Sequence, residues 1–244
     1  MTLARDGWRE MLASTLTLGG GAVACAVASR VNSAYWLLPS VVFAGFWLFT
    51  IAFFRVPSRS VPTEPGVLVA PADGRVTEVT RLDAHEGITG PALKISIFLS
   101  VFDVHVNCAP CDGAVVDVLY RPGEFLDARH PECGVRNESN TMTIQPDGIP
   151  GRVIVRQIAG LIARRIVCNA KVGDHLARGE LFGLIKFGSR TDVIVASDSG
   201  LEPAVRVGQH VKCRETILLS AAQIPPVRET ARADRKSAME TTPA

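Results

Sequence analysis

The sequence has little net charge. Its 26 lysines and arginines are nearly balanced by 24 aspartates and glutamates, which leaves a formal charge of +2. It also lacks a basic run with interleaved aromatic residues, the pattern typical of nucleic-acid binding. We therefore expect no nucleic-acid partner. A small positive charge is compatible with an anionic membrane surface.

The cysteine spacing of a zinc site is missing as well. Cys108 and Cys111 form a CxxC pair, but no second pair follows at zinc-finger spacing. The six cysteines are even in number, yet a chain of 244 residues, 47% of them hydrophobic, can build a core without disulfides. We expect no bound metal and reduced cysteines in a cytosolic domain.

Long uncharged runs occur only near the N-terminus. Residues 34–54 are twenty-one residues without a charge, enough to cross a hydrocarbon layer of roughly 30 Å as a helix. Residues 11–29 form a weaker run, interrupted by Gly19, Gly20 and Gly21. Arginines flank the two runs on both outer sides, namely Arg5, Arg9, Arg55 and Arg59. By the positive-inside rule, the sequence predicts a hydrophobic helical hairpin with both ends in the cytoplasm.

A cleaved signal peptide is the alternative for the first run, because Ala26, Val27 and Ala28 offer a small-residue cleavage site. The second run would still anchor the protein, so the membrane prediction holds in either case. A buried core helix fits a segment this long and this apolar less well.

Three segments follow from this pattern. Residues 1–56 form the membrane-associated hairpin, and a proline-rich linker begins the folded domain over residues 57–224. Residues 225–244 begin with two prolines and end in mixed charge, which predicts a disordered tail.

The folded domain contains two internal repeats. Residues 67–79 (VLVAPADGRVTEV) match residues 106–118 (VNCAPCDGAVVDV), and residues 171–182 (KVGDHLARGELF) match residues 206–217 (RVGQHVKCRETI). Short β-branched runs separated by Gly, Pro and Asp are typical of a mostly β domain. Turns like those in residues 171–182 and 206–217 occur in the barrel-sandwich hybrid of lipoyl and biotinyl domains. The sequence thus predicts an α+β chain, with a duplicated barrel-sandwich-hybrid-like β domain after the hairpin.

A membrane-anchored adaptor with such a domain is the non-enzyme alternative. A lipoyl or biotinyl carrier is disfavoured, because Lys171, Lys186 and Lys212 lack the Met-Lys or Asp-Lys context of the modified lysine.

The Gly188–Ser189 bond can undergo a specific reaction. Ser189 Oγ can attack the carbonyl of Gly188, since glycine offers no side chain to block the approach and tolerates a strained backbone. The ester formed in this way can lose its carboxylate by β-elimination, and hydrolysis of the remaining dehydroalanine leaves a pyruvoyl ketone. A Gly-Ser dipeptide alone is usually an ordinary turn, so the surrounding sequence has to decide.

Four blocks around these residues resemble the phosphatidylserine decarboxylase family in its short, single-domain, type A-like proenzyme form. They are residues 70–76 (APADGRV), 96–107 (SIFLSVFDVHVN), 157–166 (QIAGLIARRI) and 183–190 (GLIKFGSR). The blocks occur in order and span most of residues 56–220, so the resemblance is far more specific than Gly-Ser alone.

The resemblance implies a carboxy-lyase of phospholipid biosynthesis that converts phosphatidylserine to phosphatidylethanolamine. The substrate amine would form a Schiff base with the pyruvoyl group derived from Ser189, which replaces pyridoxal phosphate. Autocatalytic cleavage would give a β chain (1–188) and an α chain (189–244) that remain together as a heterodimer. We expect the enzyme at the cell membrane, with its catalytic domain on the cytoplasmic side.

Residue roles follow from the same resemblance. Ser189 becomes the pyruvoyl group and Gly188 the new C-terminus, while Asp73 matches an aspartate of a self-cleavage triad. His105 matches a histidine of the decarboxylation step, where an imidazole that titrates near neutral pH can protonate the carbanion. The chain departs from longer relatives at Cys108, where they have the second histidine of the triad. Either His105 serves both steps, or backbone strain suffices for cleavage.

Contacts to the substrate are predicted less directly. Arg164 and Arg165 lie in a family-like block, and a guanidinium suits a phosphate. Asn137 lies in the long loop over residues 122–141, which either covers the active site or is a plain solvated loop. His175 and His210 occupy equivalent repeat turns, which favours a structural role for both.

A pyruvoyl decarboxylase acting on a soluble amino acid is the rival within enzymes, and the apolar hairpin argues against it. Related lipid headgroups, such as archaetidylserine or phosphatidylthreonine, fit the sequence equally well.

Overall fold

The structure, a computed structural model, describes residues 1–161, 165–186 and 188–221. The tail predicted over residues 225–244 and the candidate Arg164 lie outside the described residues.

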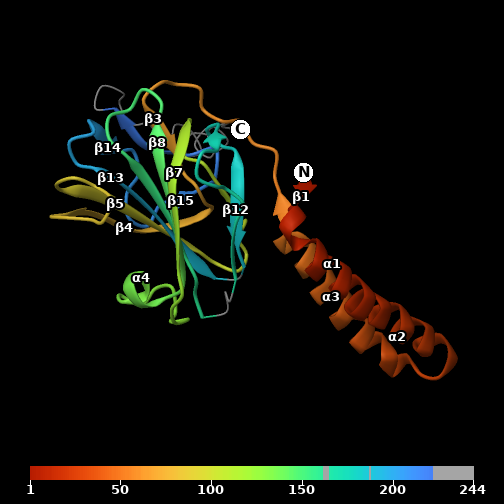
Figure 1. Ribbon diagram of the computed structural model, residues 1–244. Coiled ribbons are helices and arrows are strands. Elements are labelled where there is room, and N and C mark those ends of the chain that lie inside the picture. Colours follow the sequence, from red (N-terminus) through yellow and green to blue (C-terminus); the bar gives the residue numbers. More distant parts are fainter. Residues whose placement is uncertain (162–164, 187, 222–244) are drawn as a thin grey trace, which may run out of the picture.

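The N-terminal region forms a helical hairpin that projects from the β domain (Figure 1). Its strands β1 (Thr2–Leu3) and β2 (Arg55–Val56) pair at the base and bring the start of the chain beside the end of the hairpin. The helical elements are a 3-10 turn (Arg5–Gly7), α1 (Trp8–Ser14), a π turn (Thr15–Gly19), α2 (Gly20–Val31), a 3-10 turn (Ala34–Trp36) and α3 (Leu37–Phe53).

The glycines of the first apolar run do not end its helix. Gly19 and Gly21 lie against α3, and a Cβ on Gly21 would come within 3.2 Å of the Phe43 ring. The absence of side chains therefore lets the two helices pack closely. Polar contacts add to this packing, since the Trp47 indole donates to Thr15 Oγ1 at 3.0 Å.

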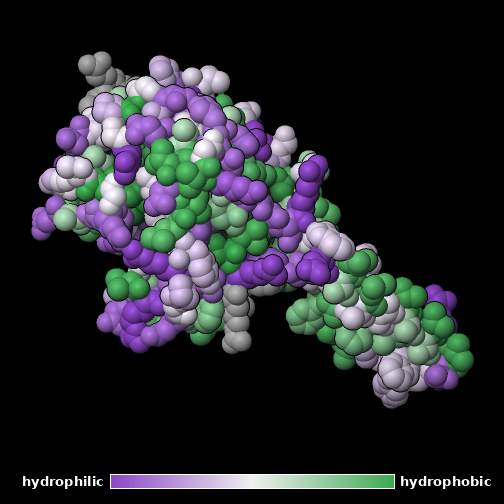
Figure 2. Space-filling model, in the orientation of Figure 1, coloured by the Kyte–Doolittle hydropathy of each residue, from purple (hydrophilic) through white to green (hydrophobic). Residues whose placement is uncertain are grey.

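Both arms of the hairpin are long and apolar enough to cross a membrane. The spans are Arg5–Val31 and Ala34–Phe53, and only 11% and 6% of the most apolar stretch of each is buried. Figure 2 shows the green apolar surface that results. The large exposed side chains on the two arms are Trp8, Leu12, Leu16, Val23, Val27, Val31, Tyr35, Trp36, Leu37, Leu38, Val41, Val42, Phe43, Phe46 and Leu48. This surface fits membrane association.

The rest of the described chain is almost entirely β. The eight-stranded sheet has the order β11-β7-β8-β9-β13-β5-β4-β15, and its hydrogen-bonded neighbours are antiparallel. Its strands are β4 (Gly74–Leu82), β5 (Ala92–Leu99), β7 (Gly113–Arg121), β8 (Ser139–Pro146), β9 (Val153–Ile158), β11 (His175–Leu176), β13 (Ser189–Ala196) and β15 (His210–Val211).

Two three-stranded sheets complete the domain, with the orders β10-β12-β6 and β14-β16-β3. Their strands are β3 (Val67–Val69), β6 (Val106–Cys108), β10 (Ile166–Cys168), β12 (Leu181–Ile185), β14 (Leu201–Pro203) and β16 (Ile217–Ala221). A single helical turn, α4 (Cys133–Arg136), lies in the loop between β7 and β8. The predicted mostly β, α+β fold is confirmed.

The internal repeats correspond to equivalent positions in this architecture. Strands β4 and β7 each begin at the glycine of an Asp-Gly pair. The first pairs with β15 and the second with β11, which are the Gly-x-His turns of the other repeat and the two ends of the eight-stranded sheet. The domain therefore has two similar halves, and each combines one copy of both repeats: β3 and β4 pair with β16 and β15, and β6 and β7 pair with β12 and β11.

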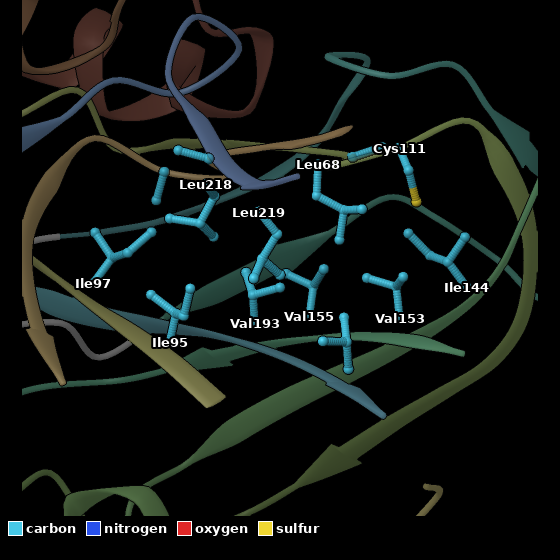
Figure 3. Packing of buried hydrophobic residues seen from close by; sticks show 14 of the residues in the cluster. Leu68, Ile95, Ile97, Cys111, Ile144, Val153, Val155, Val193, Leu218 and Leu219 are labelled. Carbon is cyan, nitrogen blue, oxygen red and sulfur yellow. The ribbon is translucent and has the colours of Figure 1, made fainter. Parts of the chain in front are cut away.

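The hydrophobic core lies between the sheets. It consists of β-branched and leucine side chains that alternate along the strands, as a sheet with one buried face requires. Figure 3 shows Leu68, Ile95, Ile97, Val155 and Val193 converging there. A separate apolar cluster joins the base of the hairpin to the domain through Phe53, Phe54, Val104, Val106 and Leu184.

Candidate active site

The Gly188–Ser189 bond lies where the chain passes from β12 to β13. Gly188 has φ +60°, in the left-handed region that favours glycine. Ser189 is the first residue of β13, pairs with Leu99 of β5, and is completely buried. Its Oγ has no hydrogen-bond partner among the described residues. A buried hydroxyl without a partner is uncommon and points to a chemical role.

The carbonyl of Gly188 lies against a second glycine. A Cβ built on Gly160 would be 2.1 Å from the Gly188 carbonyl oxygen and 3.3 Å from Ala128 Cβ. Only a residue without a side chain fits at position 160, so the loop after β9 packs directly on the bond that is expected to break.

His105 lies just before β6 and is buried. Its Nδ1 is 2.9 Å from the carbonyl oxygen of Asp103, and since a carbonyl only accepts, Nδ1 carries the proton. Nε2 is then an acceptor, and it is buried without a partner among the described residues. Burial lowers the pKa of His105 to about 4, although the Asp103 carbonyl counteracts part of the shift. The expectation that this imidazole titrates near neutral pH is therefore wrong, and the ring is neutral at pH 7.

Strand β6 contacts the chain on both sides of the Gly188–Ser189 bond. Before the bond, the His105 carbonyl accepts from the Ile185 N–H at 3.2 Å. After it, the Asn107 amide donates to Thr191 Oγ1 at 3.2 Å. These contacts bring the His105 end of β6 and the start of β13 together. The Phe53 ring covers the imidazole, with the two ring centroids 4.1 Å apart.

Asp73 is held by different partners. Arg59 forms a two-pronged ion pair with its carboxylate, and the Cys213 N–H donates to Asp73 Oδ1 at 2.7 Å. No hydrogen bond joins Asp73 to His105 or Ser189 within the described part of the chain. The backbone contact recurs in the other half of the domain, where the Arg178 N–H donates to Asp112 Oδ1 at 2.9 Å. Asp73 thus makes the same turn contact as Asp112, and the ion pair with Arg59 distinguishes it from Asp112.

Cys108, at the position of the missing second histidine, faces a second thiol. The Cys213 thiol donates to Cys108 Sγ across 2.9 Å, and both side chains are buried. Burial, followed by the Cys108 contact, raises the pKa of Cys213 well above its ordinary value. The buried thiol pair lies next to the Arg59–Asp73 ion pair, because the Cys213 backbone also contacts both members of that pair.

The predicted substrate contacts are only partly visible. The Arg165 side chain is exposed, and its carbonyl accepts from the Lys186 N–H at 3.2 Å. Asn137 is buried and makes three hydrogen bonds of 2.8–2.9 Å, all to the backbone of Leu126 and Ala159. Asn137 therefore connects the 122–141 loop to the backbone of Ala159, the residue before Gly160. His175 and His210 each bind an aspartate, at 3.0 Å from Asp147 and 2.9 Å from Asp103.

A cavity of about 530 Å³ lies on the opposite face of β13 from Ser189. Arg190 and Asp192 line it, whereas Ser189 and Thr191 alternate to the other face. Its cations are largely matched by carboxylates, since Arg190 pairs with Asp192 at 2.6 Å and Lys94 with Glu78 at 2.9 Å. Ala128 links its edge to Gly160.

The contacts from the N-terminal region were not predicted from the sequence. Phe53 covers His105, Arg59 holds Asp73, and Glu10 binds Lys186, which lies two residues before Gly188. The only sequence signal was the charge of Glu10 and Arg59 beside an apolar segment, which does not specify a partner.

Comparison with known proteins gives one consistent result. Residues 46–219 match the family model described as phosphatidylserine decarboxylase. The phosphatidylserine decarboxylase proenzyme of Trichlorobacter lovleyi is 47% identical over 84% of this chain and 88% of its own length. Those of Symbiobacterium thermophilum and Rhodopirellula baltica are 44% and 39% identical, over 88% and 89% of this chain and 94% and 87% of their own lengths.

Proposed function

The chain belongs to the phosphatidylserine decarboxylase family, and from this premise we propose that it decarboxylates phosphatidylserine to phosphatidylethanolamine with a pyruvoyl group made from its own Ser189. The observation that carries the proposal is the buried, unpartnered Ser189 Oγ directly after a glycine at φ +60°. A hydroxyl in that position is ready to attack the preceding carbonyl.

Self-cleavage would proceed through an ester between Gly188 and Ser189. The Oγ–H proton passes to a base while Oγ bonds to the Gly188 carbonyl carbon, and the C–N bond breaks as the nitrogen is protonated. Loss of the Ser189 Cα proton then expels the Gly188 carboxylate, and water releases ammonia from the resulting enamine. The close packing of Gly160 on the Gly188 carbonyl restricts this peptide group to one orientation, which favours attack from a fixed direction.

We infer that His105 is the base, although its Nε2 and Ser189 Oγ are not hydrogen-bonded to each other in the uncut chain. It is neutral, its free nitrogen is Nε2, and β6 holds it against the chain on either side of the bond. The alternatives are weaker, because Asp73 is neutralised by Arg59 and Cys108 is a buried thiol beside another thiol. Burial also disfavours the imidazolium, so a proton taken by His105 is returned readily. This behaviour suits a group that accepts a proton in one step and delivers it in a later one.

The described residues fit a pyruvoyl group at position 189. When formed, that ketone supplies an electron sink for a substrate amine that loses CO₂. The chain's own part is to exclude water with Phe53 and to fix the chain end with the Leu99 pairing. His105 would accept and return the proton at Nε2, because Nδ1–H is bound to the Asp103 carbonyl.

The helical hairpin supports a lipid substrate. Its exposed apolar surface ends at Phe53 and Phe54, the residues that pack beside His105 and Lys186. A headgroup at the membrane surface would then meet the active site without leaving the lipid. We propose that the domain lies on the cytoplasmic side, in line with the flanking arginines.

A denaturing gel tests self-cleavage. Wild-type protein should separate into pieces of 188 and 56 residues, and Ser189→Ala should remain a single chain. Purified wild-type protein should release CO₂ from phosphatidylserine vesicles and not from free serine. An active wild-type enzyme that runs as one intact band would refute the mechanism, and release from free serine alone would refute the lipid substrate.

A further inference from the structure

Lys186 is a buried lysine two residues before the bond expected to break. Lys186 is 6% exposed, and its Nζ lies 2.5 Å from Glu10 Oε1 and 5.9 Å from the centroid of the Phe54 ring. Glu10 is its only carboxylate partner within the described part of the chain. A buried ammonium is strongly disfavoured without a counter-charge, so this pair is expected to stay closed.

The connection between β12 and β13 is held at both ends. Before it, Lys186 is bound by Glu10 through its side chain and by the Arg165 carbonyl through its N–H, at 3.2 Å. After it, Ser189 is fixed in the sheet by its pairing with Leu99. The backbone between these two points includes Gly188, so a shift of Lys186 would move the carbonyl that Ser189 must attack.

Glu10 belongs to the hairpin and not to the β domain. It lies in α1, which continues without a break through the π turn into α2. The same end of the hairpin makes a second, more exposed contact, in which the Asn169 amide donates to Asp6 at 2.9 Å. The contact to Lys186 therefore connects the orientation of the hairpin directly to the connection that contains Gly188.

We propose, on the basis of the proposed self-cleavage, that Glu10 is a positioning residue for this reaction: through Lys186 it holds the Gly188 carbonyl in reach of Ser189 Oγ. The hairpin then has a role in maturation besides membrane attachment. A chain whose hairpin is not seated against the domain stays uncleaved.

The test follows chain separation over time in full-length protein. Glu10→Gln keeps the shape of the side chain and removes its charge, and it should slow separation at least about tenfold, equivalent to about 1.4 kcal/mol on the barrier. The charge swap Glu10→Lys with Lys186→Glu should recover most of the rate. Asp6→Asn is the matched control, because it removes the charge from the neighbouring contact between the same end of the hairpin and the domain, and it should change the rate less than about twofold.

Two further measurements separate positioning from folding. In a Ser189→Ala background, the thermal midpoint of each variant reports stability alone, and Glu10→Gln should shift it no more than Asp6→Asn. Hydroxylamine cleaves esters, so it accelerates a reaction that is slow after the ester has formed. It should not rescue Glu10→Gln, because the proposed defect precedes the ester.

The outcomes are distinguishable. Wild-type protein that never separates contradicts the proposed function itself. Wild-type protein that separates, together with a Glu10→Gln variant that separates equally fast, contradicts only the positioning role. A variant that is slow solely because its thermal midpoint has collapsed also contradicts it.

Discussion

His105 illustrates how much a single buried side chain can determine. The ring is covered by Phe53, its Nδ1 proton is bound to the Asp103 carbonyl, and its pKa is lowered to about 4, mainly by burial. Protonating it would place a charge in an apolar site, so the folded protein resists the proton until well below the ordinary histidine range.

This depressed pKa predicts how stability depends on pH. Between about pH 6.5 and 4 the unfolded chain binds a proton at His105 and the folded chain does not, so the free energy of unfolding should fall as the pH falls. The loss attributable to this residue should reach about 3 kcal/mol at pH 4. Denaturant unfolding of Ser189→Ala against Ser189→Ala with His105→Gln measures it. Parallel pH profiles for the two proteins would show that His105 is not buried in its neutral form.

The site predictions from sequence concern residues with an intrinsic chemical or conformational preference. A glycine before a serine and a histidine in the block at residues 96–107 led to Gly188, Ser189 and His105. The long-range contacts near these residues could not be predicted. Glu10 and Lys186, for example, are 176 positions apart and meet only after the domain has folded. The pKa of His105 was misjudged for the same reason, since it depends on burial.

At the scale of elements, the duplicated turns separate the contact that Asp73 shares with Asp112 from the ion pair that distinguishes Asp73. Asp73 and Asp112 accept a backbone N–H in the same way, but Asp73 also binds the buried Arg59 in a two-pronged ion pair. Hydrogen bonding to Asp73 raises the pKa of Arg59 further above its ordinary value. The half-buried Asp112 carboxylate has one charged partner among the described residues, the Arg178 guanidinium at 3.8 Å.

We expect Asp73→Asn to be far more damaging than Asp112→Asn. Asparagine retains an oxygen for the backbone N–H, but it leaves the largely buried Arg59 charge with only the longer 3.8 Å contact to Glu215 among the described residues, at a cost of roughly 3 kcal/mol in the free energy of unfolding. Chemical denaturation in the Ser189→Ala background measures this difference, and the denaturing gel shows its effect on cleavage. Equal losses in the two variants would mean that the ion pair contributes nothing beyond the shared turn.

The elements themselves were predicted well where the repeats gave a local pattern. The Asp-Gly starts of β4 and β7 and the His turns of β11 and β15 lie as their matching sequences require. The continuous first arm of the hairpin was harder to predict, because its glycines favour helix only when Phe43 and Trp47 of α3 pack against them.

At the scale of the whole molecule, the proposed cleavage at Gly188–Ser189 would divide the chain but not the fold. The small piece begins with β13, which lies between β5 and β9 in the middle of the eight-stranded sheet, and it includes β15 and β16. The large piece supplies the strands on either side. The two pieces would therefore be held together by the same hydrogen bonds and core contacts as the uncut chain.

The thiol pair provides a chemical test of this arrangement. Cys213 is the only cysteine after residue 188, and its Sγ lies 2.9 Å from Cys108 Sγ in the large piece. Diamide, an azo oxidant that takes two electrons and two protons from a pair of thiols, should join the pieces of the mature protein into one band on a non-reducing gel. Because burial raises the pKa of Cys213, the reaction should be slow at pH 7 and faster at higher pH.

Cys108→Ser should abolish this cross-link, and Cys111→Ser should leave it in place. A link that persists without Cys108 would mean that Cys213 lies elsewhere in the mature protein.

The central position of β13 has a consequence for the life of the molecule after maturation. Refolding of the uncut chain joins strands that one backbone keeps at high local concentration, whereas two separated fragments must find each other in a bimolecular search. Denaturation of the mature form should therefore be practically irreversible, and its lifetime should be set by the height of the unfolding barrier and not by an equilibrium.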